Sequence, residues 1–291
     1  MDKNLLYKKT EELLKEYLVQ TIKEIKEMVR KGEGKEITGD VEGRPEDFET
    51  SIDLAGEEIL ERLIKKYKLP ALIFPEHNSS LGDNEHPEIF GALDSFDGTK
   101  LFYKGFEHMW YSVLSFYEKD STPILGGIAD ILNEKLYLST GDKNYLISLK
   151  DNEKKEIFPS RAKTLVGNHS IASYLMSSQY FPKFFKYFGK LIEGMDPKTL
   201  LYPNGGSCIY AYLASGKIDA YIMFDEPRSE IDPGLVLAKA ASCEVVSVNP
   251  DGSWEDYQFM PRRQHDKVNL FIAACTPELR DELIKYYIEH K

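Results

Sequence analysis

One short segment in the middle of the chain carries the strongest chemical signal. Residues 93–99 have the sequence LDSFDGT, which places Asp94 at the end of an apolar strand and Asp97 in the turn that follows. Two carboxylates at this spacing can converge on one hard cation, and Mg²⁺ is typically held by one or two carboxylates together with waters. Gly98 permits a close backbone approach, so its amide and that of Thr99 can bind a phosphate if a short helix starts there.

The simpler interpretation of this segment is a tight Asp-Gly turn between two strands, which is common in proteins. The whole pattern D-x-x-D-G-[ST] is rarer, and average composition gives it a chance occurrence on the order of 1% in a chain of this length. The complete pattern therefore favours a metal and phosphate site over a plain turn.

Further acids stand at the edges of other expected elements. Glu76 follows the short apolar run 71–74, and Asp53 lies in the first turn of a helix. Glu230 and Asp232 precede a helix that contains glycine. Each acid alone fits a structural role, as a loop acid, a cap or a first-turn acid that favours the helix dipole. Together with the acids of 93–99, they place a carboxylate at the edge of four separate elements.

This ordered set of motifs resembles the inositol monophosphatase-like superfamily of metal-dependent, often lithium-sensitive phosphatases. The set comprises T-x-x-D at 50–53, Glu at 76, L-D-x-x-D-G-T at 93–99, Gly-Ser at 206–207 and an acid near 230. The resemblance covers nearly the whole chain, as far as 271–274, which matches the family's last strand. It implies an α/β fold, a layered α/β/α/β/α sandwich. It also implies a Mg²⁺-dependent phosphatase acting on a small sugar or polyol phosphate, such as inositol monophosphate or fructose 1,6-bisphosphate.

The resemblance assigns metal ligands residue by residue. Glu76, Asp94 and the carbonyl of Phe96 match the ligands of a first metal ion, and Glu76 also counts as catalytic. Asp94 matches the bridge to a second ion, which Asp97 also binds. Two or three Mg²⁺ ions held in this way would polarise the phosphate and activate a water that attacks phosphorus in line. The resemblance also implies that Li⁺ inhibits the reaction.

The same resemblance assigns the groups around the substrate. Asp53 and Thr99 match the pair that orients the attacking water. The amides of Gly98 and Thr99 match the phosphate cradle, while Gly206 and Ser207 match a turn that lines the substrate pocket.

The second metal site departs from the family pattern. Inositol monophosphatases carry Trp-Asp before the last site helix, and alignment on Gly234 puts Ser229 at the Trp and Glu230 at the Asp. The string at 230–233 is similar to the E-x-N-P string of fructose-1,6-bisphosphatases, in which Glu is the ligand. We therefore favour Glu230 over Asp232 as the ligand. If neither residue binds a metal, the second site is weak.

The substrate-binding positions also depart from the pattern. Where inositol monophosphatases hold sugar hydroxyls with a Glu, this chain has Met223, and Asp225 or Glu226 could replace it from the following loop. His77 stands where many members have a second Glu, and Lys100 adds a cation beside the phosphate cradle. Two alternatives therefore stay open: a 3′-phosphonucleotide as substrate, and a catalytically weakened relative that binds a phosphorylated ligand or partner.

Hydrophobic periodicity and turn signals predict the elements that must position these residues. Helices are expected at 3–31, 52–67, 171–188 with a break at Pro182, 207–215, 234–241 and 277–289. A strand is expected at 71–74, antiparallel strands at 89–93, 111–117, 123–131, 135–139 and 145–149, and further strands at 164–167, 218–224, 243–248 and 270–274. The polar stretch 32–45 is expected to be a mobile loop. A polar run near 150 suggests an N-terminal part, 1–150, that holds most metal ligands, and a C-terminal part, 151–291, within one compact unit.

Composition excludes several classes of protein. The 291 residues are 42% hydrophobic and 29% charged, as in ordinary globular proteins, and the formal charge of −11 argues against a nucleic-acid binder. No stretch approaches the roughly 20 apolar residues of a membrane span, and no signal peptide is visible. The three cysteines lack CxxC spacing, so we expect buried thiols in a reducing, cytoplasmic compartment. A small phosphorylated substrate is the expected partner, and the resemblance suggests a homodimer.

Overall fold

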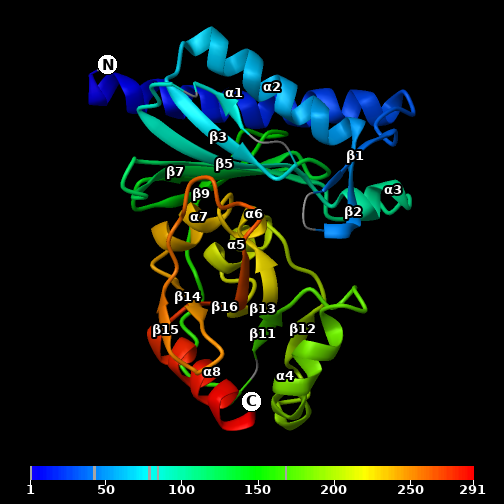
Figure 1. Ribbon diagram of the computed structural model, residues 1–291, viewed down its shortest axis with the longest axis vertical. Coiled ribbons are helices and arrows are strands. Elements are labelled where there is room, and N and C mark those ends of the chain that lie inside the picture. Colours follow the sequence, from blue (N-terminus) through cyan, green and yellow to red (C-terminus); the bar gives the residue numbers. More distant parts are fainter. Residues whose placement is uncertain (1, 42–43, 78–79, 84, 168) are drawn as a thin grey trace.

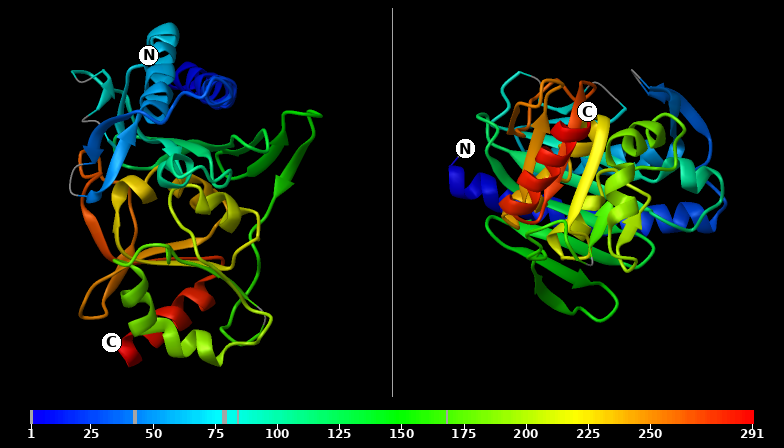
Figure 2. Two further views of the ribbon diagram at one scale, coloured as in Figure 1. Left: turned by 90° about the vertical axis from the view of Figure 1, so that its right-hand side faces the viewer. Right: turned by 90° about the horizontal axis from the view of Figure 1, so that it is seen from below.

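Layers of helix and sheet alternate along the long axis of the molecule (Figure 1). This computed structural model describes residues 2–41, 44–77, 80–83, 85–167 and 169–291. Within these ranges two sheets are stacked with short helices between them, and longer helices cover both outer faces (Figure 2). The layered helices are α1 (Lys3–Arg30) and α2 (Ser51–Tyr67) on one outer face, α5 (Ile209–Ala214), α6 (Arg228–Ile231) and α7 (Leu235–Ala240) in the middle, and α4 (Phe181–Gly194) and α8 (Pro277–His290) on the other outer face. The predicted α/β/α/β/α sandwich is confirmed.

The first sheet contains the strands that the middle of the sequence predicts. Its order in the described residues is β10-β9-β8-β7-β6-β5-β3-β4. The bounds are β3 (Ala71–Pro75), β4 (Leu81–Gly82), β5 (Ile89–Asp97), β6 (Tyr111–Tyr117), β7 (Pro123–Asp130), β8 (Lys135–Thr140), β9 (Asn144–Ser148) and β10 (Lys154–Ile157). The pairs are antiparallel as expected, except that β3 runs parallel to β5. This parallel pair brings the carboxyl end of β3, and thus Glu76, to the same edge as the acids of β5.

The second sheet has the order β12-β11-β13-β16-β14-β15 in the described residues. Its strands are β11 (Ser170–Ala172), β12 (Leu200–Tyr202), β13 (Ala220–Pro227), β14 (Glu244–Val248), β15 (Trp254–Asp256) and β16 (Lys267–Ala274). β11 runs parallel to both β12 and β13, and the other pairs are antiparallel.

Two predictions in this half are wrong. The strand expected at 164–167 is a run of bends, and the strand lies instead at β11, inside the segment expected to be helical. The helix there begins only at Phe181, and Pro182 lies in its first turn rather than at a break. Proline is tolerated at that position because the first-turn N–H has no partner within the helix. β11 has only three residues, of which two are apolar, and this is too few to distinguish a strand from a helix by periodicity.

The polar stretch 32–45 is also not simply a loop. It contains β1 (Ile37–Val41) and the start of β2 (Arg44–Thr50), which pair as an antiparallel ribbon that continues directly into α2. Thr38 Oγ1 donates a hydrogen bond to Glu49 Oε2 across this ribbon at 2.9 Å. Backbone pairing requires no apolar side chains, so strands with few hydrophobic residues, such as Ile37 and Val41 in β1, gave no clear alternating pattern. Part of the predicted loop, residues 42–43, lies outside the described residues.

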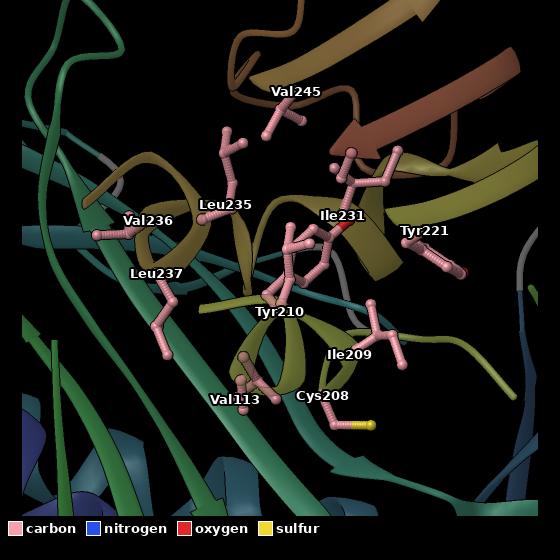
Figure 3. Packing of buried hydrophobic residues seen from close by; sticks show 14 of the residues in the cluster. Val113, Cys208, Ile209, Tyr210, Tyr221, Ile231, Leu235, Val236, Leu237 and Val245 are labelled. Atoms are coloured by element: carbon pink, nitrogen blue, oxygen red, sulfur yellow. The ribbon is translucent and has the colours of Figure 1, made fainter. Parts of the chain in front are cut away.

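Apolar side chains fill the spaces between the layers. On β13, Tyr221 and Met223 pack toward the middle helices, whereas Ile222 and Phe224 pack toward α4 and α8. Figure 3 shows the middle layer, where side chains of α5 and α7 meet β6 of the first sheet. A strand covered on both faces becomes a continuous apolar run, which is why the sequence signal of β13 was strong. The predicted core positions Trp110 and Tyr111, and the three cysteines, are buried.

Candidate active site

The strand that carries the acid motif is longer than predicted. β5 pairs regularly with β6 as far as Asp94, and the pairing then becomes irregular until Asp97. Such an irregularity redirects side chains, so both carboxylates can face one side. Gly98 follows with φ 114°, and a Cβ there would overlap the carbonyl oxygen of Met109. The short helix α3 (Thr99–Tyr103) starts immediately afterwards, as the phosphate-cradle interpretation requires.

Asp53 and Thr99, 46 residues apart in sequence, meet at the start of α2. Asp53 Oδ2 accepts hydrogen bonds from the backbone N–H and the hydroxyl of Thr50, both at 2.7 Å, so the capping interpretation holds. Asp53 Oδ1 lies 2.9 Å from Thr99 Oγ1, which is also 2.9 Å from the carbonyl oxygen of Phe96. One buried carboxylate thus caps a helix and orients the Thr99 hydroxyl.

Four acids from three separate parts of the chain line one cavity of about 780 Å³, part of which is open solvent. These acids are Glu76, Asp94, Asp97 and Glu230. Burial raises the pKa of Asp94 well above its usual range, and the other three carboxylates raise it further, whereas a hydrogen bond from Ser207 lowers it. The structure therefore brings four acidic side chains close together, and two of them, Glu76 and Asp94, are buried.

The pKa of Asp97 is raised for the same two reasons as that of Asp94. Burial raises this pKa to about 7, and the neighbouring Glu76 carboxylate adds to the rise. Hydrogen bonds from Cys208 oppose the rise, and the Cys208 N–H lies 2.8 Å from Asp97 Oδ2. Gly206 has φ 97°, and a Cβ on it would lie 2.9 Å from both Asp97 oxygens, so glycine lets this turn close over the carboxylate.

The donor set of the cavity fits a hard divalent cation. Oδ1 of Asp94 is buried and accepts no hydrogen bond from any described residue. Mutually repelling carboxylates are what a bound divalent cation would stabilise in their ionised form. Within the described part of the chain, no three His, Cys, Asp or Glu side chains already form a closed ligand cluster.

Glu230 and Asp232 have different surroundings. Glu230 lines the cavity, and its carbonyl oxygen accepts a hydrogen bond from Ser207 Oγ at 3.1 Å. Asp232 is not among the residues that line the cavity; its Oδ1 accepts a hydrogen bond from the hydroxyl of Tyr257 at 2.7 Å. Its backbone carbonyl accepts another from Tyr117. Asp232 is thus bonded into the core, where burial raises its pKa to about 7.

The residues considered as substitutes for the missing sugar-binding Glu belong to a strand, not to a loop, because β13 extends to Pro227. Met223 and Glu226 both line the cavity. Asp225 instead forms an ion pair with Lys183 of α4. Glu226 is buried and accepts a hydrogen bond from the hydroxyl of Tyr221.

His77, Lys100 and Gly206 also line the cavity, whereas Ser207 lies behind it, where its hydroxyl donates a hydrogen bond to the carbonyl oxygen of Glu230. His77 Nε2 lies 3.7 Å from Asp53 Oδ1 and 3.6 Å from Glu76 Oε2.

Sequence reasoning missed a further group of lining residues from the second sheet. They are Tyr174, Met176, Tyr180, Asn204, Gly205 and Tyr221. Several of them follow β11 and β12, and correct assignment of these two strands would have pointed to them, because the carboxyl ends of parallel strands commonly line ligand sites.

The family of the chain follows from its sequence as a whole. The model of the inositol monophosphatase family matches residues 10–288. The chain belongs to the inositol monophosphatase family. Membership supports a phosphatase of the inositol monophosphatase type, in a family that is generally metal-dependent and acts on small phosphorylated substrates. The resemblance stated from the motifs is confirmed.

Solved structures of this family share the fold at low sequence identity. The extragenic suppressor protein suhB from Bartonella henselae is 15% identical, with a TM-score of 0.69 over 94% of this chain and 98% of that one. Inositol monophosphatase II from Staphylococcus aureus MSSA476 is 16% identical, with a TM-score of 0.66 over 98% and 93%. A hypothetical protein from Pyrococcus horikoshii with similarities to inositol-1 monophosphatase is 21% identical, with a TM-score of 0.61 over 83% and 84%.

No curated protein matches the chain. In the described residues, no helix has both the length and the apolar character that crossing a membrane requires.

Proposed function

We propose that this protein is a Mg²⁺-dependent phosphatase that hydrolyses a small phosphate monoester with an activated water. The observation that carries the proposal is a group of four carboxylates around one cavity, two of them buried and two half-buried, in a chain of this family. Burial of so much like charge destabilises a folded protein unless a cation binds there. Metal binding would explain why the sequence retains this group of carboxylates.

The proposed metal ligands are Glu76, Asp94, the carbonyl of Phe96, Asp97 and Glu230. When bound there, Mg²⁺ supplies Lewis-acid activation of water and phosphate. Asp94 is proposed as a ligand because its buried carboxyl lies in the same cavity as Glu76, Asp97 and Glu230, and all three raise its pKa. Cys208 and Ser207 hold the carboxylates of Asp97 and Asp94, and so limit the directions in which those oxygens can move.

The proposed water-orienting pair is Asp53 and Thr99. Asp53 fixes the Thr99 hydroxyl through the 2.9 Å contact, so that hydroxyl can position a water without reorganising. Gly98 turns the chain so that its own amide and that of Thr99 precede α3, and these two amides are proposed to bind the phosphate. Gly206 is proposed to close the cavity on the substrate side, and Ser207 to support this turn from behind.

Phosphate release from a panel of monoesters, with Mg²⁺ and with EDTA, tests this function. We expect hydrolysis only with Mg²⁺, and its loss in Asp94→Asn. Binding of phosphorylated ligands with no release of phosphate from any ester would overturn the proposal in favour of a catalytically weakened binding protein. Hydrolysis that persists in EDTA would overturn the metal-dependent mechanism.

A further inference from the structure

The helix that carries Glu230 cannot fix the position of this side chain by itself. α6 has four residues and lies between the two sheets (Figure 1). A helix of one turn is not stable on its own, so its place in the fold depends on contacts with other elements. The direction in which the Glu230 carboxylate points into the cavity depends on the same contacts.

Asp232 directly follows α6 and joins it to two separate parts of the protein. Its Oδ1 accepts a hydrogen bond from the hydroxyl of Tyr257 at 2.7 Å, and its backbone carbonyl accepts one from the hydroxyl of Tyr117. Tyr117 ends β6 of the first sheet, whereas Tyr257 follows β15 of the second. Asp232 and Tyr257 are each 2% exposed, so water competes little for the hydrogen bond between them.

Tyr257 belongs to a segment that is itself held in place. Residues 257–266 link β15 to β16, and they contact both α6 and the first sheet. The Ser229 N–H donates a hydrogen bond to the carbonyl of Gln264 at 2.8 Å. The ring of Phe259 stacks on that of Tyr117, with centroids 4.1 Å apart and an angle of 10° between the planes. The Tyr257 hydroxyl therefore approaches Asp232 from a fixed support.

The main chain around Asp232 is held independently of its side chain. Ser207 Oγ donates a hydrogen bond to the carbonyl of Glu230 at 3.1 Å, and Ser115 Oγ donates one to the carbonyl of Pro233. These carbonyl contacts remain whatever side chain stands at position 232. The hydrogen bond from Tyr257 can thus be removed by substitution while the others stay, which makes its contribution measurable.

We propose that Asp232 is a positioning residue for the second metal site: through its hydrogen bond with Tyr257 it fixes α6 and so directs the Glu230 carboxylate into the cavity. The inference rests on the proposed function, in which Glu230 is a metal ligand. Position 232 must supply an acceptor oxygen but needs no charge, because the Tyr257 hydroxyl is the donor. Groups that orient a ligand in this way typically change metal affinity by about 10- to 100-fold.

Two substitutions at position 232 separate the hydrogen bond from the filling of the core. Asp232→Asn keeps an oxygen that can accept the Tyr257 hydroxyl, whereas Asp232→Leu has a similar volume and no acceptor. Calorimetric titration of the metal-free protein with Mg²⁺ measures both ions, and Glu230→Gln identifies the ion that depends on Glu230. We expect Asp232→Leu to bind this ion about 10- to 100-fold more weakly and the other ion normally, and Asp232→Asn to bind both normally. Normal binding of both ions by Asp232→Leu, or equal losses for both, would overturn the proposal.

Tyr257→Phe tests the same hydrogen bond from the other side and serves if Asp232→Leu does not fold. It should weaken the same ion, and the double variant with Asp232→Leu should lose no more affinity than the weaker single variant, because both remove one interaction. Tyr212→Phe is the matched control, since it removes a hydroxyl that lies 2.6 Å from that of Tyr111 and does not line the cavity. A lower urea midpoint in Tyr257→Phe with normal affinity for both ions would show a structural role only and refute positioning.

Metal titration does not depend on turnover, so this inference and the proposed function can fail separately. Mg²⁺-dependent ester hydrolysis by the wild type, together with normal binding of both ions by Tyr257→Phe and Asp232→Leu, supports the phosphatase proposal and refutes positioning by Asp232. Selective weakening of the Glu230-dependent ion in these two variants, with rescue in Asp232→Asn, supports positioning even if the wild type hydrolyses no ester.

Discussion

Replacing Asp97 by Asn should make the metal-free protein more stable at high pH and remove the response to Mg²⁺. The pKa of Asp97 is about 7 in the folded protein, against 3.8 as its ordinary value. At about 1.36 kcal/mol per pKa unit, keeping this carboxylate ionised in the fold costs about 4 kcal/mol. Asn has nearly the same shape, and its carbonyl oxygen can still accept the Cys208 N–H.

The pH dependence has a definite sign. A carboxyl whose pKa is raised by folding binds more protons in the folded state than in the unfolded state between pH 3.8 and about 7. Stability of the wild-type apoprotein therefore falls as pH rises through this window, and it is not lowered by this group below the window. The advantage of Asp97→Asn should be absent at pH 3.5, grow through the window and reach about 4 kcal/mol at pH 8.

Urea unfolding across this pH range measures the effect in two parallel series, one with EDTA and one with Mg²⁺. Binding at 100 times the dissociation constant would stabilise the wild type by about 2.7 kcal/mol, and Asp97→Asn should lose most of that gain. Asp120→Asn is the matched control, because hydrogen bonds from Thr122 lower the pKa of that exposed carboxyl and its removal should give no stabilisation. A variant that is less stable than wild type at pH 8, or a difference that does not change with pH, would refute the electrostatic reasoning.

Three further outcomes follow from the site. Asp94→Asn should remain folded, lose Mg²⁺-dependent phosphate release by about 100-fold or more, and show weaker Mg²⁺ binding in calorimetry; turnover at the wild-type rate would contradict its assignment as a bridging ligand. Glu230→Gln should lose one bound Mg²⁺ and most activity, whereas Asp232→Asn should keep both ions; the opposite result in a metal titration would show that the ligand assignment is shifted by two residues. Gly98→Ala should lower the free energy of unfolding by about 1–3 kcal/mol or more, because its Cβ would overlap the carbonyl of Met109; an unchanged urea midpoint would be inconsistent with this turn.

Local patterns were sufficient for much of the fold. α1, α2 and β13 were predicted close to their observed bounds, because each buries apolar side chains at regular spacing along a long element. The Asp94 motif was visible for a similar reason, since its acids, glycine and hydroxyl are neighbours in sequence. The ribbon β1–β2 was not predicted, because backbone pairing between polar residues leaves no hydrophobic pattern.

The sequence by itself determined the family and the identity of the acids, since both depend on residue types at short, fixed spacings. Tertiary structure alone decided which acids face the cavity: Glu230 and Asp232 differ because Tyr257 and Tyr117 hold Asp232 in the core. It also brought Tyr174 and Asn204 to the cavity. Their positions depend on β11 and β12, two strands of three residues each whose register is set by pairing with distant segments rather than by their own side chains.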